Sequence, residues 1–200
     1  HDSLPELIFR GHTEAGMPRL EVWEHRGWNS FTLVYADTAV YPPPQGIMIG
    51  NVFPYAAGDV DGDGLIDVVC TNEAFFWPDS ERNVVMTLES PDPHSYPCSL
   101  SWYYLGPTNY SGTSPVYITH GLDRDGHNEI VGWLAGVGSC IWENVGNNQN
   151  ELKWTGSFGG DNLAFRDFDQ DGRSDIGTGW YGGEVWECTG DDQYERVWRD

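Results

Sequence analysis

The sequence lacks the features that define several large classes of protein. No apolar run is long enough to span a bilayer, and helical periodicity is almost absent. It has no CxxC pair for zinc, and no GxSxG elbow, HExxH pair or phosphate-cradling glycine loop for catalysis. Basic residues are scarce, because 10 Lys and Arg stand against 31 Asp and Glu, a net charge of −21. We therefore expect no membrane insertion, no nucleic-acid partner and no enzymatic activity.

What the chain does contain favours a folded all-β protein. Hydrophobic residues make up 39% and aromatic residues 14% of the sequence, which is enough to build a core. The 25 glycines and 12 prolines indicate frequent turns between short strands.

The segment from Asp59 to Asp67 has the spacing of a calcium-binding loop. Carboxylates stand at loop positions one, three, five and nine, and Gly64 at position six permits a sharp reversal of the backbone. Ca²⁺ takes about six to eight oxygen ligands, so a backbone carbonyl at position seven, that of Leu65, and water would complete the set.

The same pattern occurs twice more. One copy runs from Asp167 to Asp175, and another runs from Gly121 to Glu129 and lacks only the first carboxylate. The site with Gly121 should be weaker, or should borrow a carbonyl or water. The predicted ligands of the three sites are Asp59, Asp61, Asp63, Leu65 and Asp67; Asp123, Asp125, His127 and Glu129; and Asp167, Asp169, Asp171, Arg173 and Asp175.

The N-terminal residues match the second half of such a loop. Asp2 aligns with position five and Glu6 with position nine, although Ser3 replaces the glycine. We expect a partial fourth calcium site here, with further residues upstream of His1 in the native protein.

Each loop leads into a short β-branched stretch, so the loops are expected to connect strands and not helices. A hairpin signature then recurs, in which Trp-Glu follows a β-branched residue at Trp23, Trp142 and Trp186 and precedes a glycine-containing turn. These tryptophans could form a ladder that stacks on sugars, or they could pack between neighbouring sheets. Their recurrence at one position of the repeat favours packing. The expected four-stranded units span residues 1–36 (incomplete), 52–105, 114–156 and 157–200.

These loops and units resemble FG-GAP/VCBS repeats, the calcium-binding blades of integrin-α-type β-propellers. The resemblance covers nearly the whole chain. It implies that residues 1–200 form one β-propeller or a propeller fragment, with Ca²⁺ held between the first and second strands of each blade. The missing first strand implies further blades, or a strand supplied by a neighbouring copy.

The cysteines and one sequon favour an oxidising compartment. Four cysteines form an even set, and we expect Cys70 to pair with Cys98 and Cys140 with Cys188, although other connectivities are open. Asn109 begins an N-glycosylation sequon. No signal peptide is visible, so we expect a mature or trimmed chain located outside the cell or on its surface.

Three functions are consistent with these features. The first is a secreted, calcium-stabilised glycoprotein with a structural or adhesive role, which assembles with itself in a fibre or surface layer or binds extracellular glycans or proteins. The second is a lectin-like module that stacks sugars on aromatic residues such as Trp180 and Tyr181. The third is a calcium-dependent polysaccharide lyase.

Overall fold

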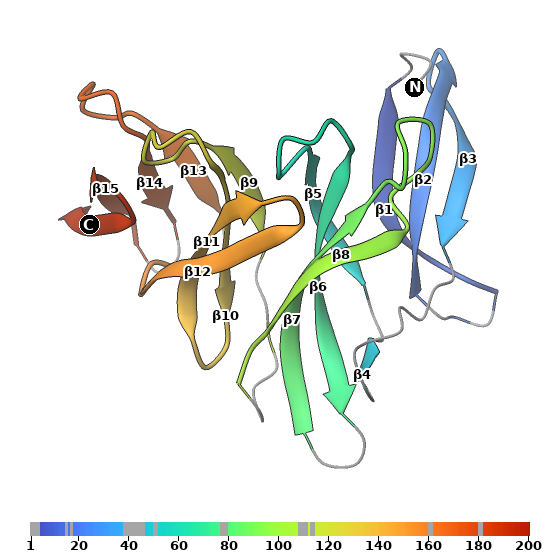
Figure 1. Ribbon diagram of the computed structural model, residues 1–200, viewed down its shortest axis with the longest axis horizontal. Helices are drawn as coiled ribbons and strands as arrows, with labels where there is room; N and C mark the ends of the chain where they lie inside the picture. The colour runs from blue at the N-terminus through green and yellow to red at the C-terminus, as the bar shows by residue number, and fades with distance from the viewer. Residues whose placement is uncertain are drawn as a thin grey trace. The chain divides into compact units, whose positions relative to one another are not determined.

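The computed structural model describes residues 5–14, 16, 18–37, 47–49, 52–76, 80–107, 112, 115–159, 162–179 and 182–200. These residues form strands in four antiparallel sheets and no helix (Figure 1), which confirms the all-β prediction. Among them, no helix is long and apolar enough to cross a membrane. By contacts the chain divides into two compact units, residues 1–59 with 64–111, and residues 60–63 with 112–200.

The first unit contains two sheets. Sheet I has the order β1-β2-β3, and sheet II has β6 paired with β4, β5 and β7, and β7 with β8. The strands are β1 (Glu6–His12), β2 (Pro18–Gly27), β3 (Ser30–Asp37), β4 (Ile47–Ile49), β5 (Phe53–Gly58), β6 (Asp67–Phe76), β7 (Ser80–Glu89) and β8 (Ser99–Leu105). Between the two sheets lies a core in which Leu20 packs with Val68, Cys70 and Met86, and against which Ile8 and Tyr35 pack.

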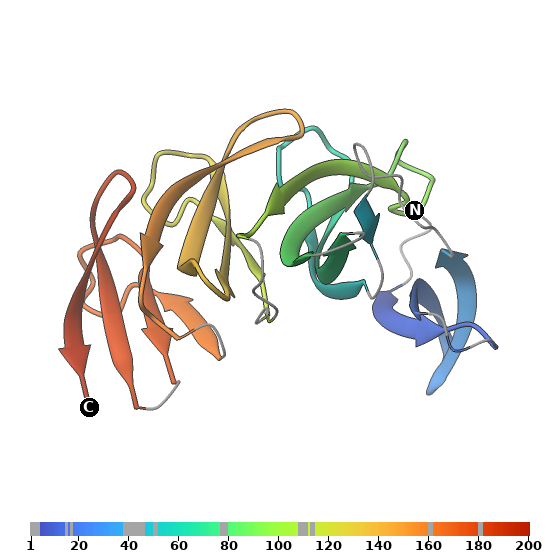
Figure 2. The ribbon, with the colours of Figure 1, turned by 90° about the horizontal axis from the view of Figure 1, so that it is seen from below.

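The second unit also contains two sheets, here with four strands each, which lie side by side in Figures 1 and 2. Sheet III contains β9 (Tyr117–His120), β10 (Asn128–Leu134), β11 (Gly138–Gly146) and β12 (Gln149–Gly156). Sheet IV contains β13 (Leu163–Arg166), β14 (Asp175–Thr178), β15 (Glu184–Gly190) and β16 (Gln193–Arg199). The core between them joins Val131 and Ile141 of sheet III to Ile176 and Trp186 of sheet IV.

Three hairpins share the same irregularities of register. In β2–β3, β11–β12 and β15–β16, one register shift falls directly before the tryptophan of the Trp-Glu signature, and another falls before the glycine that precedes the turn. Each turn contains a residue with positive φ, which asparagine and aspartate tolerate better than most residues. These are Asn29 (φ 50°), Asn148 (φ 56°) and Asp192 (φ 54°).

The tryptophans of the hairpin signature differ in exposure, and two of the three are buried. Trp142 has no exposed surface and Trp186 is 9% exposed, whereas Trp23 is half-buried. Trp154, on β12, makes edge contacts with Trp186 at 5.6 Å and stacks on Phe158 at 5.4 Å between ring centroids. Burial favours packing over sugar stacking for Trp142 and Trp186.

The expected disulfides are wrong. Cys70, Cys98, Cys140 and Cys188 are all free thiols. Cys70, Cys140 and Cys188 are buried within strands, and their sulfur atoms contact backbone carbonyls close by in sequence, those of Val68, Gly138 and Gly190. These cysteines therefore pack as small apolar residues, which an even count alone does not distinguish from a disulfide framework.

Candidate metal-binding loops

The three acidic loops connect the strands β5–β6, β9–β10 and β13–β14, and they share one backbone conformation. The glycine at position six has positive φ in each, with values of 89°, 93° and 92° at Gly64, Gly126 and Gly172. Position four is also left-handed, and it is filled by Gly62 (φ 80°), Arg124 (φ 74°) and Gln170 (φ 67°). Two residues with positive φ in one short loop coil the backbone tightly, which turns alternate side chains to the same side.

Hydrogen bonds within each loop fix the carboxylate of position three. This carboxylate accepts the backbone N–H of position five in all three loops, from Asp63 to Asp61 (3.3 Å), Asp125 to Asp123 (3.3 Å) and Asp171 to Asp169 (3.0 Å). In two loops position five in turn accepts the N–H of position seven, from His127 to Asp125 (2.7 Å) and from Arg173 to Asp171 (2.7 Å). The side chains are thus oriented by the backbone of their own loop.

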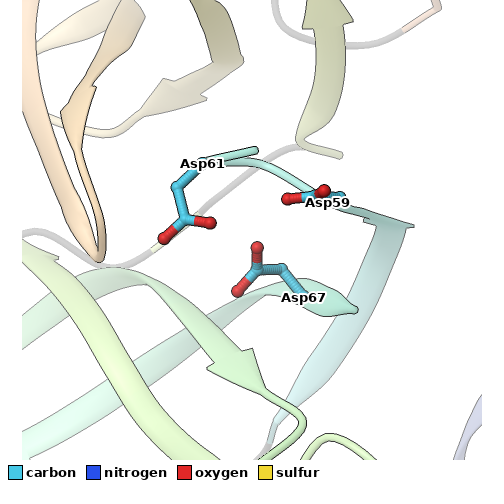
Figure 3. Close-up of side chains that lie close together, drawn as sticks. All are labelled: Asp59, Asp61 and Asp67. Carbon is cyan, nitrogen blue, oxygen red and sulfur yellow. The ribbon is translucent and has the colours of Figure 1, made fainter. Parts of the chain in front are cut away.

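In the first and third loops, the carboxylates of positions one, three and nine converge. One oxygen from each of Asp59, Asp61 and Asp67 lies within 4.8 Å of the other two, and Figure 3 shows the three carboxylates turned toward a common point. Asp167, Asp169 and Asp175 form the same cluster. Carboxylates at this separation repel one another unless a cation or protons lie among them.

The acid at position nine joins the two ends of its loop. One oxygen of Asp175 accepts the N–H of Phe168 at position two over 2.9 Å. The other oxygen, Oδ1, is buried and accepts no hydrogen bond within the described part of the chain, and the same holds for Asp167 Oδ1. Burial, with the nearby charges of Asp169, Asp171 and Asp167, raises the pKa of Asp175.

In the second loop, where Gly121 replaces the first acid, both oxygens of the position-nine acid are engaged. Glu129 accepts the N–H of Leu122 (3.0 Å to Oε1) and the hydroxyl of Thr119 (2.7 Å to Oε2). Burial is the largest influence on this side chain and raises the pKa of Glu129 to about 7.

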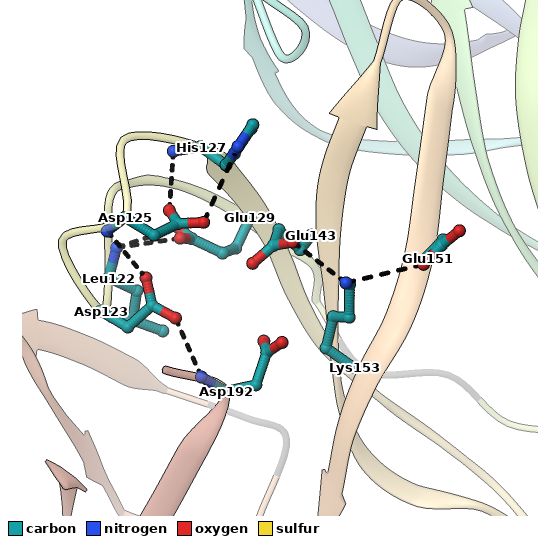
Figure 4. Close-up of polar contacts among 9 residues, drawn as sticks. All are labelled: Leu122, Asp123, Asp125, His127, Glu129, Glu143, Glu151, Lys153 and Asp192. Atoms are coloured by element: carbon teal, nitrogen blue, oxygen red, sulfur yellow. Dashed lines mark hydrogen bonds and ion pairs between the residues drawn. The ribbon is translucent and has the colours of Figure 1, made fainter. Parts of the chain in front are cut away.

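The acidic cluster of the second loop instead extends to the neighbouring sheet. Asp123 lies within 4.8 Å of carboxylate oxygens of Glu143 and Asp192, and a second group joins Asp123, Asp125 and Asp191. The N–H of Asp192, in the β15–β16 turn, donates to Asp123 Oδ2 over 3.0 Å (Figure 4). Burial raises the pKa values of both Glu143 and Asp192.

A lysine already neutralises part of this second cluster. Lys153 Nζ lies 3.3 Å from Glu143 Oε1 and 3.6 Å from Glu151 Oε2 (Figure 4). The sequence pattern did not single out Glu143 as a ligand, nor Lys153, Asp191 or Asp192. The one available indication was that the acidic pair Asp191-Asp192 occupies the turn where another repeat has Asn147-Asn148.

The remaining predicted site residues lie at position seven of the loops, at the start of β1, or outside the residues that the structure describes. The carbonyl of His127 accepts the N–H of Gly121 over 2.9 Å, so it closes the loop; Leu65 and Arg173 occupy the same position in their own loops. Glu6 begins β1 and lies opposite Glu24 in the sheet. Asp2, Asn109, Trp180 and Tyr181 lie outside the described residues.

Comparison with known proteins adds no family to this description. The chain matches no protein-family model, and neither the curated proteins nor the solved structures contain a significant match. The fold and the acidic loops therefore carry the functional argument.

Proposed function

We propose that this protein is a calcium-stabilised repeat protein of the integrin-α-like propeller type, with a structural or adhesive role outside the cell. The observation that carries the proposal is a pair of buried oxygens, Asp167 Oδ1 and Asp175 Oδ1, which lie in one carboxylate cluster and accept no hydrogen bond from the residues that the structure describes. A buried carboxylate oxygen without a donor is costly, and a cation at that point would satisfy it.

The chemistry of the donors fits calcium better than a transition metal. The clusters of the first and third loops consist of carboxylate oxygens only, and oxygen-only sites suit hard cations. Asp59, Asp61 and Asp67 would hold one ion, and Asp167, Asp169 and Asp175 another, with backbone carbonyls and water completing each shell. The second loop, with Gly121 at position one, would bind more weakly.

Bound calcium would act as a structural link. In the first and third loops, the ion would connect the loop residues that follow one strand to the first residue of the next strand. That first residue is Asp67 in β6 and Asp175 in β14. With a net charge of −21, the chain also gains from any bound cation that reduces the repulsion among its acids. The absence of a catalytic motif from the sequence favours a structural or adhesive role over polysaccharide cleavage.

Thermal unfolding in calcium and in a chelator tests the proposal. Calcium should raise the melting temperature, whereas magnesium at the same concentration should raise it much less, because Mg²⁺ prefers a stricter geometry and keeps its waters. Superimposable melting curves in calcium and in chelator would refute the proposal.

A further inference from the structure

The second acidic loop does not offer the three carboxylates that converge in the other two loops. Gly121 stands at position one, and both oxygens of Glu129 at position nine already accept hydrogen bonds. Asp123 at position three clusters instead with Glu143 and Asp192, which lie outside the loop. A cation bound at Asp123 would therefore take its other carboxylate ligands from elsewhere in the unit.

Two different elements bring Glu143 and Asp192 to Asp123. Glu143 lies on β11, opposite Glu129 of β10, and is buried. Asp192 lies in the β15–β16 turn, and its N–H donates to Asp123 Oδ2 over 3.0 Å. Figure 4 shows the carboxylates of Asp123, Glu143 and Asp192 turned toward a common space. The cluster thus joins sheet III to sheet IV within the second unit.

The charges of this cluster are not balanced by its lysine. Lys153 Nζ lies 3.3 Å from Glu143 Oε1. When all three carboxylates are ionised, one ammonium group leaves two negative charges uncompensated, which one divalent cation would neutralise. Asp123 is 9% exposed and Glu143 is 5% exposed, so water screens their repulsion poorly. Since the cluster offers carboxylate oxygens only, it suits a hard cation such as Ca²⁺.

A buried hydroxyl beside the cluster is a separate indication of a ligand. Tyr194 is 6% exposed, and its hydroxyl has no hydrogen-bond partner within the described part of the chain. Its ring contacts Trp154 of sheet III at 5.4 Å and packs with Leu122, the residue before Asp123. Burial raises the pKa of Tyr194, and the charges of Asp123 and Asp192 are close enough to raise it further. A buried hydroxyl without a partner is costly, and a water molecule held by a cation in the cluster would provide one.

The hairpin turns that meet the first and second loops differ in charge. In the second unit, the N–H of Asn148 donates to Asp61 of the first loop, as the N–H of Asp192 donates to the second loop. The first loop has its own acid at position one, and the turn that meets it contains two asparagines. The second loop has Gly121 there, and the turn that meets it contains Asp191 and Asp192. The neighbouring hairpin therefore supplies a carboxylate where the loop lacks one.

We propose that Asp123, Glu143 and Asp192 bind one calcium ion between sheets III and IV. The inference rests on the proposed function, because it names the residues that hold the ion of the second loop. The ion would take one ligand from the loop, one from β11 and one from the β15–β16 turn, and water would complete its shell. It would fasten the β15–β16 hairpin to sheet III in addition to the packing of the core.

Native mass spectrometry during a calcium titration tests the proposal. In the double variant Asp61→Asn and Asp169→Asn, which disables the first and third loops, one ion should still bind. Adding Asp192→Asn or Glu143→Gln should weaken its binding by roughly tenfold or more, because each change removes a charged ligand.

The control is a change at the neighbouring turn residue. Asp191→Asn removes the same charge from the same turn and should leave the ion bound. Asp192→Asn should keep the fold, because Asn29 and Asn148 occupy this position of the other two hairpins with the same positive φ. Circular dichroism shows whether each variant is folded.

Lys153→Met provides a test with the opposite sign. The change removes a positive charge beside Glu143, so the ion should bind more tightly, by roughly threefold or more. A residue that served the packing alone would not strengthen calcium binding when it is replaced. An affinity that stays the same or falls in this variant would contradict the proposed site.

The other results that would overturn the proposal are equally direct. They are a double variant that binds no ion, an ion that Asp192→Asn and Glu143→Gln leave in place, and an ion that Asp191→Asn removes as readily. The proposed function fails separately. If Asp61→Asn and Asp169→Asn leave the number of ions unchanged while Asp192→Asn removes one, the first and third loops are not calcium sites and the site between the sheets stands.

Discussion

The substitution Asp175→Asn should have opposite effects on stability with and without calcium. Asparagine keeps the shape and can still accept the N–H of Phe168 through its side-chain oxygen, but it removes the negative charge. Without a cation, the charge of Asp175 is costly, because burial and three neighbouring aspartates raise its pKa. In chelator the variant should therefore melt at the same temperature as the wild type or higher.

With calcium the order should reverse. A ligand at 100 times its dissociation constant stabilises the folded state by about 2.7 kcal/mol, which the variant would forfeit if it no longer bound. For a chain of this size, that loss corresponds to a melting temperature lower by roughly 5–11 °C.

Scanning calorimetry in calcium and in chelator measures both effects. Glu195→Gln provides the control, because it removes one charge from an exposed position in the same sheet and should shift both curves little. A variant that is less stable than the wild type by the same amount in both buffers would refute the reasoning, since the effect would then not depend on the cation.

Three further predictions concern other parts of the molecule. Lys153→Met should lower the melting temperature in chelator near neutral pH, because it leaves the buried Glu143 without its cation. Burial raises the pKa of Glu143, so the loss of stability should shrink as the pH falls toward 4.5 and Glu143 protonates. A loss of stability that does not change with pH would contradict this. Phe158→Ala should lower the free energy of unfolding, measured with a chemical denaturant, by about 3–5 kcal/mol, because Phe158 is fully buried between Trp154 and Trp186. A decrease of less than about 1 kcal/mol would contradict the packing described for this core. A thiol reagent should react with four free thiols in denaturant but rapidly only with Cys98 in the native protein. The other three cysteines, Cys70, Cys140 and Cys188, are buried, and burial raises the pKa of Cys140 to about 12. Fewer than four reactive thiols in denaturant would indicate disulfides.

Local features of the fold were readable from the sequence because they depend on residues close together in the chain. The β-branched residues after each loop and the glycine at position six specify strands and a reversal without help from the rest of the protein. The left-handed residue at position four was missed, because Arg124 and Gln170 carry no compositional sign of that conformation.

Features that depend on contacts between repeats were not readable. Asp192 reaches Asp123 only because two sheets pack together, and Lys153 meets Glu143 only through the register of β11 and β12. The cysteines led to a wrong prediction for the same reason. The spacing of cysteines along a chain does not show whether their side chains face one another or pack separately in the core, as the buried Cys70, Cys140 and Cys188 do.

The number of calcium ions bound per chain tests the central claim most directly. Native mass spectrometry during a calcium titration should show at least two ions, held by the first and third loops, and a weaker third at the Gly121 loop. Asp61→Asn and Asp169→Asn should each remove one of the first two. A chain that remains free of calcium at millimolar concentrations, or that binds the same number of ions in both variants, would contradict the account.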